Sequence, residues 1–441
     1  MTQEPSTQAE HMTPFLILWT GEAISLVGTM AAQFALIWWL TKETGSAAVL
    51  SMATLFGLLP SVAFGPVIGV LVDRWDRKRV MLISDAMVAL ASLTLAYLFF
   101  THTATPSSVF VILFLRGLGN AFQSPAMVAS TSLMVPRRHL TRIQGLNQLL
   151  QGGMNIIAAP LGALLLAVLS ISGVMLVDVA TALFAIIPLL FIHVPRPSPA
   201  NSAARDQANS IWTDMRAGVR YLLNRKGHLS LVVMVCLING CLVPAFSLLP
   251  LLVSRELGGN AAKLAWLSSA VGIGTITGGI LLGIWGGTRR RIMTVLPALI
   301  GLGAGVIALG IAPSYVPALA AMLVIGLIVP FVNGPIQAIL QATIAAEYQG
   351  RVFTLMGSLA GMMAPLGLLL ASPVAELTGV RAWYVTAGLV CFSMGVAGFL
   401  MPSLLQIESA PNELPSPRRD AGHAILFESS PDATSQETMT C

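Results

Sequence analysis

Twelve apolar runs, each long enough to cross a lipid bilayer, constrain the fold of this chain more than any other feature. A membrane-spanning helix needs about 20 mostly apolar residues, and hydrocarbon offers no partner to a free backbone group. Each run is therefore expected to be a helix, because a β-barrel would need alternating segments of about ten residues. The runs cover Phe15–Leu40, Val49–Val72, Val80–Phe100, Val109–Met134, Leu146–Leu169, Val174–Ile192, Leu229–Leu252, Leu264–Trp285, Ile292–Ile311, Val316–Ile339, Phe353–Val374 and Trp383–Met401.

The scarcity of charge excludes a soluble fold. Only 10% of the residues are charged and 55% are hydrophobic, whereas a soluble domain carries about 25% charged residues. The net charge of +5 would suggest a nucleic acid partner in a soluble protein, but these basic residues lie in short loops between the apolar runs. We therefore expect a lipid bilayer as the surroundings and no nucleic acid partner. The scattered histidines and cysteines form no metal-ligand pattern.

The distribution of Lys and Arg predicts the orientation in the membrane. With the N-terminus in the cytoplasm, 19 of the 24 basic residues fall in cytoplasmic segments and Arg116 lies inside a span. The four on the outer side are Lys42, Arg255, Lys263 and Arg381. This asymmetry predicts a multi-pass membrane protein with both termini in the cytoplasm.

The spans divide into two halves of six. We expect a cytoplasmic tail over residues 1–13, a six-helix bundle over 14–194, a cytoplasmic linker over 195–227, a second six-helix bundle over 228–402 and a disordered cytoplasmic tail over 403–441. In the linker, apolar residues at helical spacing alternate with arginines, which predicts an amphipathic helix on the inner membrane surface.

An internal repeat supports this division. Ala-Pro-Leu-Gly at residues 159–162 recurs at 364–367, Arg142-Ile143 recurs as Arg351-Val352, and the basic run 77–79 recurs at 289–291. The offsets of 205, 209 and 212 residues match each span to the sixth span after it. Parallel repeats of this kind predict an all-α membrane fold of two pseudo-symmetric bundles with a central site between them.

Four charged residues lie well inside the spans: Glu22, Asp85, Arg116 and Asp178. Each costs about 2.5–3.5 kcal/mol at a helix centre, and such residues usually mark proton or substrate pathways. Glu22 is the preferred proton carrier, with a packing hydrogen bond to a neighbouring helix as the alternative. Arg116 and Asp178 are expected to form an ion pair, which for Asp178 favours a structural role. For Asp85, stabilisation by the helix dipole and the basic run 77–79 is favoured over a role in proton transfer.

Polar residues recurring on single helix faces predict a mixed polar and apolar substrate cavity, with interhelical hydrogen bonds as the alternative. Ser25, Thr29 and Gln33 follow Glu22 along one face of the first span. The other candidates are Asn120, Gln123, Gln151, Asn155, Asn239, Phe246, Asn333 and Gln337.

Several motifs resemble the major facilitator superfamily. Gly69, Asp73, Arg74, Arg77 and Lys78 are similar to the signature that these proteins carry between spans two and three. Arg116 with Gly119 resembles the fourth-span signature of that superfamily, and Ala159-Pro160-Leu161-Gly162 resembles a degraded form of its drug antiporter signature.

Within that superfamily, stretches such as TGSAAVLSMATLFGLLPSVAFGPVIGVLVDR resemble the bacterial macrolide-efflux transporters. The resemblance implies a location in the bacterial inner membrane and a central cavity lined by spans 1, 4, 7 and 10. It also implies that Arg116 takes part in proton coupling and that Asp73 with the following basic residues forms an inner gate. Glu22 departs from the neutral amide that the resemblance implies at this position, which indicates a different, cationic substrate.

These observations predict a transporter, not an enzyme, that exports a small lipophilic substrate in exchange for protons. We expect a monomer that uses no cofactor and no metal, with the proton gradient as its energy source. A siderophore or metabolite exporter of the same superfamily is an alternative. A non-transporting membrane sensor or a lipid-acting enzyme is a third.

Overall fold

The computed structural model describes residues 12–136, 139–192, 194, 219–223, 225–344 and 346–408. Twelve helical segments of this part of the chain are long and apolar enough to cross a membrane, which confirms the predicted fold class. The helices are α1 Thr13–Thr44, α2 Ala47–Arg74, α3 Arg77–Phe100, α4 Pro106–Met134, α5 Leu140–Val168, α6 Ile171–Phe191, α9 Lys226–Ser247, α10 Leu249–Leu251, α11 Ala261–Trp285, α12 Ile292–Ile311, α13 Tyr315–Thr343, α14 Ala346–Thr378, α15 Val380–Phe399 and α16 Pro402–Leu405, with a π-helix, η2, over Leu252–Glu256.

The helix ends are fixed by residues suited to capping. Ser46, Thr105, Ser170 and Asn260 precede α2, α4, α6 and α11, and each side chain accepts a hydrogen bond from a backbone N–H in the first turn. The helix α1 ends at Gly45, which has a φ of 58°. Side-chain caps thus mark the starts of these four helices, whereas α1, α5, α9, α12, α13 and α15 begin without one.

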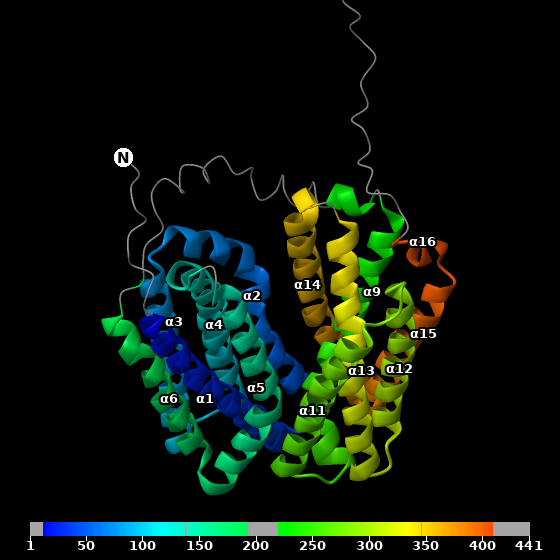
Figure 1. Ribbon diagram of the computed structural model, residues 1–441. Helices are drawn as coiled ribbons and strands as arrows, with labels where there is room; N and C mark the ends of the chain where they lie inside the picture. The colour runs from blue at the N-terminus through cyan, green and yellow to red at the C-terminus, as the bar shows by residue number, and fades with distance from the viewer. Residues whose placement is uncertain are drawn as a thin grey trace, which may run out of the picture.

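The helices form two bundles with the same internal packing. In the first, α1 packs on α5 and α6, α3 packs on α4 and α6, and α2 packs on α4. In the second, α9 packs on α14 and α15, α12 on α13 and α15, and α11 on α13. Each contact in one bundle matches a contact six spans later, as the internal repeat predicts (Figure 1).

The repeated Ala-Pro-Leu-Gly segment performs the same packing function in both bundles. A Cβ atom on Gly162 of α5 would lie 2.9 Å from the backbone oxygen of Ala31 in α1. A Cβ atom on Gly367 of α14 would collide with the backbone of Gly240 in α9. Pro244 lies four residues after Gly240 and has no N–H to bond its carbonyl, so the glycine approaches a carbonyl without a helical partner.

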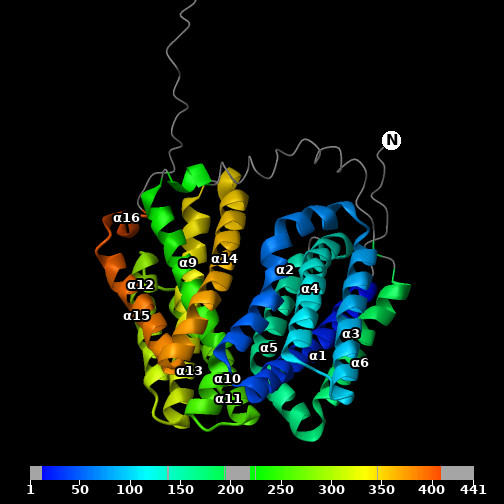
Figure 2. The ribbon, with the colours of Figure 1, turned by 180° about the vertical axis from the view of Figure 1, so that it is seen from behind.

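The two bundles contact each other unequally along their length. We call the end where α1 begins and α6 ends the linker end, and the opposite end the far end. The bundles meet through α5 against α11 and α2 against α14. Their ribbons converge at the far end and diverge toward the linker end (Figures 1 and 2).

Several expectations fall on residues outside the described part of the chain. They are the tail up to residue 11, most of the linker with its amphipathic helix, and the C-terminal tail from residue 409. Residues 219–223, at the end of that linker, are helical.

The close approach at Gly367 predicts a test of the fold. Gly367→Val should lower the thermal stability of the detergent-solubilised protein, because overpacking typically costs about 1–3 kcal/mol. Gly357→Val is the matched control, since Gly357 lies on the same helix and a Cβ atom there would meet no atom within 4 Å. Thermal unfolding followed by size-exclusion chromatography measures both variants. Equal midpoints for the two would show that the contact of α14 with α9 does not require the glycine.

Candidate functional site

A buried ion pair lies at the centre of the N-terminal bundle. Nη1 of Arg116 on α4 lies 2.5 Å from Oδ2 of Asp178 on α6, and the two side chains are 3% and 1% exposed. The predicted pairing of these residues is therefore confirmed. A buried pair is stable only when the remaining polar atoms also find partners, because both ions have lost their water.

Two hydroxyl groups complete this ion pair. Thr29 on α1 donates to Oδ1 of Asp178 at 3.0 Å, and Ser92 on α3 donates to Oδ2 at 2.7 Å. Arg116 also donates to the Ser92 hydroxyl and, at 3.4 Å, to the backbone oxygen of Thr29. We call Thr29, Ser92, Arg116 and Asp178 the ion-pair layer. It ties together α1, α3, α4 and α6.

A second polar cluster lies closer to the linker end. Nε2 of Gln123 on α4 donates to Oε1 of Glu22 on α1 at 2.6 Å. The carboxyl group of Asp85 on α3 lies within hydrogen-bonding reach of both Glu22 and Gln123. One Asp85 oxygen is fully buried and has no donor. We call Glu22, Asp85 and Gln123 the carboxyl layer.

The position of Asp85 corrects the interpretation made from the sequence. The favoured explanation was stabilisation by the helix dipole and the basic residues at the start of α3. Asp85 is the ninth residue of α3, and the dipole effect falls off within the first turn. Its neighbours Glu22 and Gln123 place Asp85 with the proton-coupling candidates instead.

The two layers are built from the same three helices at the same spacing. The carboxyl layer uses residues 22, 85 and 123, and the ion-pair layer uses residues 29, 92 and 116 of α1, α3 and α4. Each helix thus contributes two residues seven positions apart, which is about two turns or ~10.5 Å. Asp85 followed by Ser92 carries this spacing in the sequence, although Ser92 was not among the predicted residues.

The basic segment between α2 and α3 is anchored within its own bundle. Nη1 of Arg77 donates to the backbone oxygen of Ala129 on α4, and Nζ of Lys78 donates to that of Leu190 on α6, each at 2.8 Å. Arg291 makes a comparable bond in the other half, donating to the backbone oxygen of Ala338 on α13 at 3.2 Å. A Cβ atom on Gly69 would meet open space. The side chains of Asp73 and Arg74 lie outside the described part of the structure.

Five of the amide side chains predicted to line a cavity are exposed, and they lie away from the ends of their helices. These residues are Asn120, Gln151, Asn155, Asn333 and Gln337. A Cβ atom on Gly152, beside Gln151, would lie 3.8 Å from Ile276, and one on Gly272 would lie 2.9 Å from the backbone oxygen of Asn155. This face of α5 is therefore turned toward the C-terminal bundle.

Asn120 occupies a comparable position on α4. It lies on the helix surface between Arg116, which points to α1 and α6, and Gly117, which packs against Gly57 of α2. An exposed amide in hydrocarbon would lack hydrogen-bond partners, so we expect these side chains to face water instead of lipid tails.

The remaining cavity candidates have mixed surroundings. Ser25 and Gln33 are half-buried on α1, and Asn239 donates to the backbone oxygen of Val235 on its own helix at 2.9 Å. Thr29, predicted for the cavity, uses its hydroxyl in the ion-pair layer. Among the residues placed by the structure, no group of three or more His, Cys, Asp or Glu side chains could hold a metal ion.

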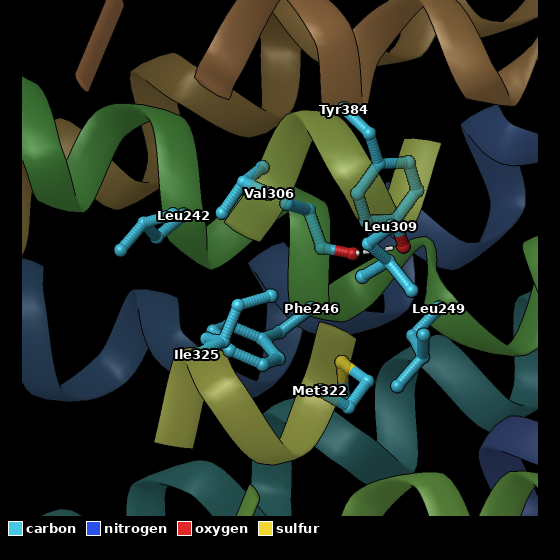
Figure 3. A pocket seen from close by; sticks show the side chains of 9 residues that line it. Leu242, Phe246, Leu249, Val306, Leu309, Met322, Ile325 and Tyr384 are labelled. Carbon is cyan, nitrogen blue, oxygen red and sulfur yellow. Dashed lines mark hydrogen bonds between the residues drawn. The ribbon is translucent and has the colours of Figure 1, made fainter. Parts of the chain in front are cut away.

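Phe246 lines a small apolar pocket inside the C-terminal bundle. Its ring lies beside Ile325 and Met322, and the Tyr384 hydroxyl donates to the backbone oxygen of Ala245 at 2.6 Å (Figure 3). The lining residues are Leu242, Ala245, Phe246, Leu249, Val306, Leu309, Met322, Ile325 and Tyr384. The pocket lies among helices of the C-terminal bundle, and Phe246 itself remains 40% exposed.

Comparison with known proteins gives the family. The profile of the Major Facilitator Superfamily matches residues 18–367 and 246–433. Macrolide efflux protein A of Streptococcus pyogenes is 33% identical over 384 residues, which cover 86% of this chain and 94% of the relative. Multidrug efflux pump Tap of Mycolicibacterium fortuitum is 27% identical over 410 residues, covering 90% of this chain and 98% of the relative.

The fold is also similar to solved transporter structures. The crystal structure of the peptide transporter POT in complex with sulfate superposes with a TM-score of 0.67 over 92% of this chain and 97% of that one, at 14% identity. At this identity the likeness concerns the fold alone. The superfamily profile and the curated relatives, together with the twelve candidate spans, identify a multi-pass membrane transporter and not an enzyme. The chain therefore belongs to the Major Facilitator Superfamily.

Proposed function

We propose that this chain exports lipophilic small molecules from the cytoplasm in exchange for protons that enter through the same protein. The observation that carries the proposal is the carboxyl layer, in which Glu22 and Asp85 share a site within a membrane-spanning bundle. The relatives named as a macrolide efflux protein and a multidrug efflux pump support export of this class of compound.

The orientation follows from the basic residues. With the linker end in the cytoplasm, the excess of Lys and Arg lies on the cytoplasmic side, as is usual for inner membrane proteins. In this orientation the bundles touch on the outer side and diverge toward the cytoplasm. Such a conformation would admit a substrate from the cytoplasm and would have to reverse its opening to release it outside.

The proton site follows from the contact between two carboxyl groups. Two ionised carboxylates in contact away from water repel each other strongly, so the pair is expected to hold one proton. That proton supplies the donor that the buried Asp85 oxygen lacks. When a substrate binds from the cytoplasm, the pair loses the proton from a carboxyl O–H to the cytoplasm and is left as two carboxylates. After export, a proton from outside restores the pair.

The ion-pair layer has a different task in this scheme. Arginine remains protonated in proteins, so Arg116 is a permanent positive partner for Asp178 and not a proton carrier. Its bonds to α1, α3 and α6 hold the helices that carry the carboxyl layer. The N-terminal bundle can then move as one body when the opening changes sides.

Drug susceptibility tests the proposed export directly. Expression of the chain in a bacterial host without its own efflux pumps should raise the inhibitory concentration of macrolides or of other lipophilic drugs. A panel of antibiotics with different charges would measure this. Unchanged susceptibility to every compound would remove the proposal of drug export.

Proton coupling predicts a specific loss in variants of the carboxyl layer. Glu22→Gln and Asp85→Asn should abolish the drug-dependent release of protons in inverted membrane vesicles, because the shared proton site is lost. Substrate binding, measured with a radiolabelled macrolide, should persist in at least one of them. Glu43→Gln is the control, since Glu43 is an exposed carboxylate at the end of the same helix α1. Proton release by both layer variants at the rate of the control would contradict the assignment.

The ion pair predicts a non-additive effect on stability. Arg116→Gln or Asp178→Asn alone should lower the thermal stability strongly, because loss of one partner of a buried pair costs about 3–5 kcal/mol. The double variant should recover part of that loss, since no unpaired charge remains. Melting temperatures in detergent measure the three variants. A double variant as unstable as the sum of the singles would argue against the pairing.

A further inference from the structure

The hydrogen bonds that cross between the bundles share an unusual feature among the described residues. In each, a side chain of the C-terminal bundle bonds to the N-terminal bundle at a helix start or beside a proline. At both kinds of site the helix leaves backbone N–H or C=O groups without a partner of its own. The crossing bonds come from Glu376 on α14 and Ser269 on α11. All of them lie between the middle of the spans and the far end, where the bundles meet.

Glu376 caps the start of α2. One of its carboxylate oxygens accepts hydrogen bonds from the Ser46 hydroxyl at 2.8 Å and from the backbone N–H of Ala48 at 3.1 Å. Ser46 is the N-cap residue of α2, and its own hydroxyl oxygen accepts from the N–H of Val49. The first N–H groups of a helix have no partner within the helix, and the positive end of its dipole favours a carboxylate.

Ser269 bonds to a carbonyl that a proline has released. Its hydroxyl donates to the backbone oxygen of Ile156 on α5 at 2.7 Å. In a regular helix this oxygen would accept from the N–H of residue 160, but that residue is Pro160, which has no N–H. The free carbonyl therefore finds its donor in the opposite bundle.

Arg255 provides a further contact, with a charge opposite to that of Glu376. Its guanidinium lies against Gly45, the residue that ends α1, since a Cβ atom built on Gly45 would lie 2.9 Å from a guanidinium nitrogen. A cation at this position is favoured by the negative end of the α1 dipole. The C-terminal bundle thus places an anion at the start of α2 and a cation at the end of the preceding helix α1.

We propose that Glu376 and Ser269, assisted by Arg255, form the gate that holds the far end closed. When the bundles separate, the freed N–H and C=O groups at helix ends and at Pro160 bond to water. Water thus replaces the lost bonds, and the gate can open. Backbone groups at these sites have no helical partner in either state, so opening breaks no helix. The statement that this gate faces the outside of the cell rests on the proposed orientation.

The test is a distance measurement across the far end. Spin labels are attached to cysteines at positions 43 and 262, which are exposed on α1 and α11, after replacement of the four native cysteines by alanine. Double electron–electron resonance in lipid nanodiscs then reports the separation of the bundles. Glu376→Gln and Ser269→Ala should each add a longer-distance population, increased about fivefold over the parent protein, which corresponds to the loss of a hydrogen bond of ordinary net strength.

Matched variants separate the gate from general effects. Glu256→Gln removes a carboxylate of the same end that pairs with Arg381 inside the C-terminal bundle, at 2.9 Å. Ser268→Ala removes the neighbouring hydroxyl, which bonds only to Leu264 on its own helix. Ser269→Thr keeps a hydroxyl at the gate. All three should retain the short distance of the parent protein.

Two outcomes would overturn the gate. The first is an unchanged distance distribution in both Glu376→Gln and Ser269→Ala. The second is an equal shift in the Glu256→Gln and Ser268→Ala controls. The measurement requires no transport, so a parent protein that fails to export any drug would refute the proposed function while leaving the gate result valid.

Discussion

Hydrocarbon offers no hydrogen-bond partner, and this constraint governs where every polar group of the chain can lie. The backbone meets it by forming twelve helices, and the ionisable side chains of the N-terminal bundle meet it by pairing with one another. The two polar layers repeat at seven residues because α1, α3 and α4 return the same face to the bundle centre after two turns. The ion-pair layer and the carboxyl layer therefore lie on the same three helices, and a movement of these helices moves both layers.

The two bundles share a packing plan but differ in chemistry. The repeated glycines Gly162 and Gly367 bring α5 and α14 against α1 and α9 in the same way. Among the residues that the structure describes, the charged layers lie in the N-terminal spans, while the C-terminal bundle has the apolar pocket around Phe246 (Figure 3). This asymmetry fits a division in which one bundle handles protons and the other contributes apolar surface. The contacts of the proposed gate join side chains of the C-terminal bundle to main-chain groups left free at helix ends and at Pro160.

The sequence was sufficient for the fold because hydropathy is a local property that survives any arrangement of the helices. The twelve spans, the repeat and the Arg116–Asp178 pair were all predicted. The pair was predictable because two opposite charges at the same depth in apolar spans have few other partners. Asp85 was misjudged because its role depends on the rotation of α3, which turns it toward Glu22 instead of the basic run. Ser92 was missed because a single serine in an apolar helix carries no signal by itself. Phe246 shares a face with Asn239 in the sequence, but the sequence could not show that it also lines an apolar pocket with residues of α12, α13 and α15.

The most direct test is whether water reaches the polar face between the bundles. Single cysteines are introduced in place of Asn120, in the middle of α4, or Leu90, in the middle of α3. Both positions are exposed on the protein surface. Asn120 is expected to face water between the bundles and Leu90 to face lipid tails. In a cysteine-free protein in nanodiscs, a membrane-impermeant maleimide should label Asn120→Cys rapidly and leave Leu90→Cys unlabelled. Equal labelling of the two, or none at Asn120→Cys, would show that no aqueous crevice separates the bundles.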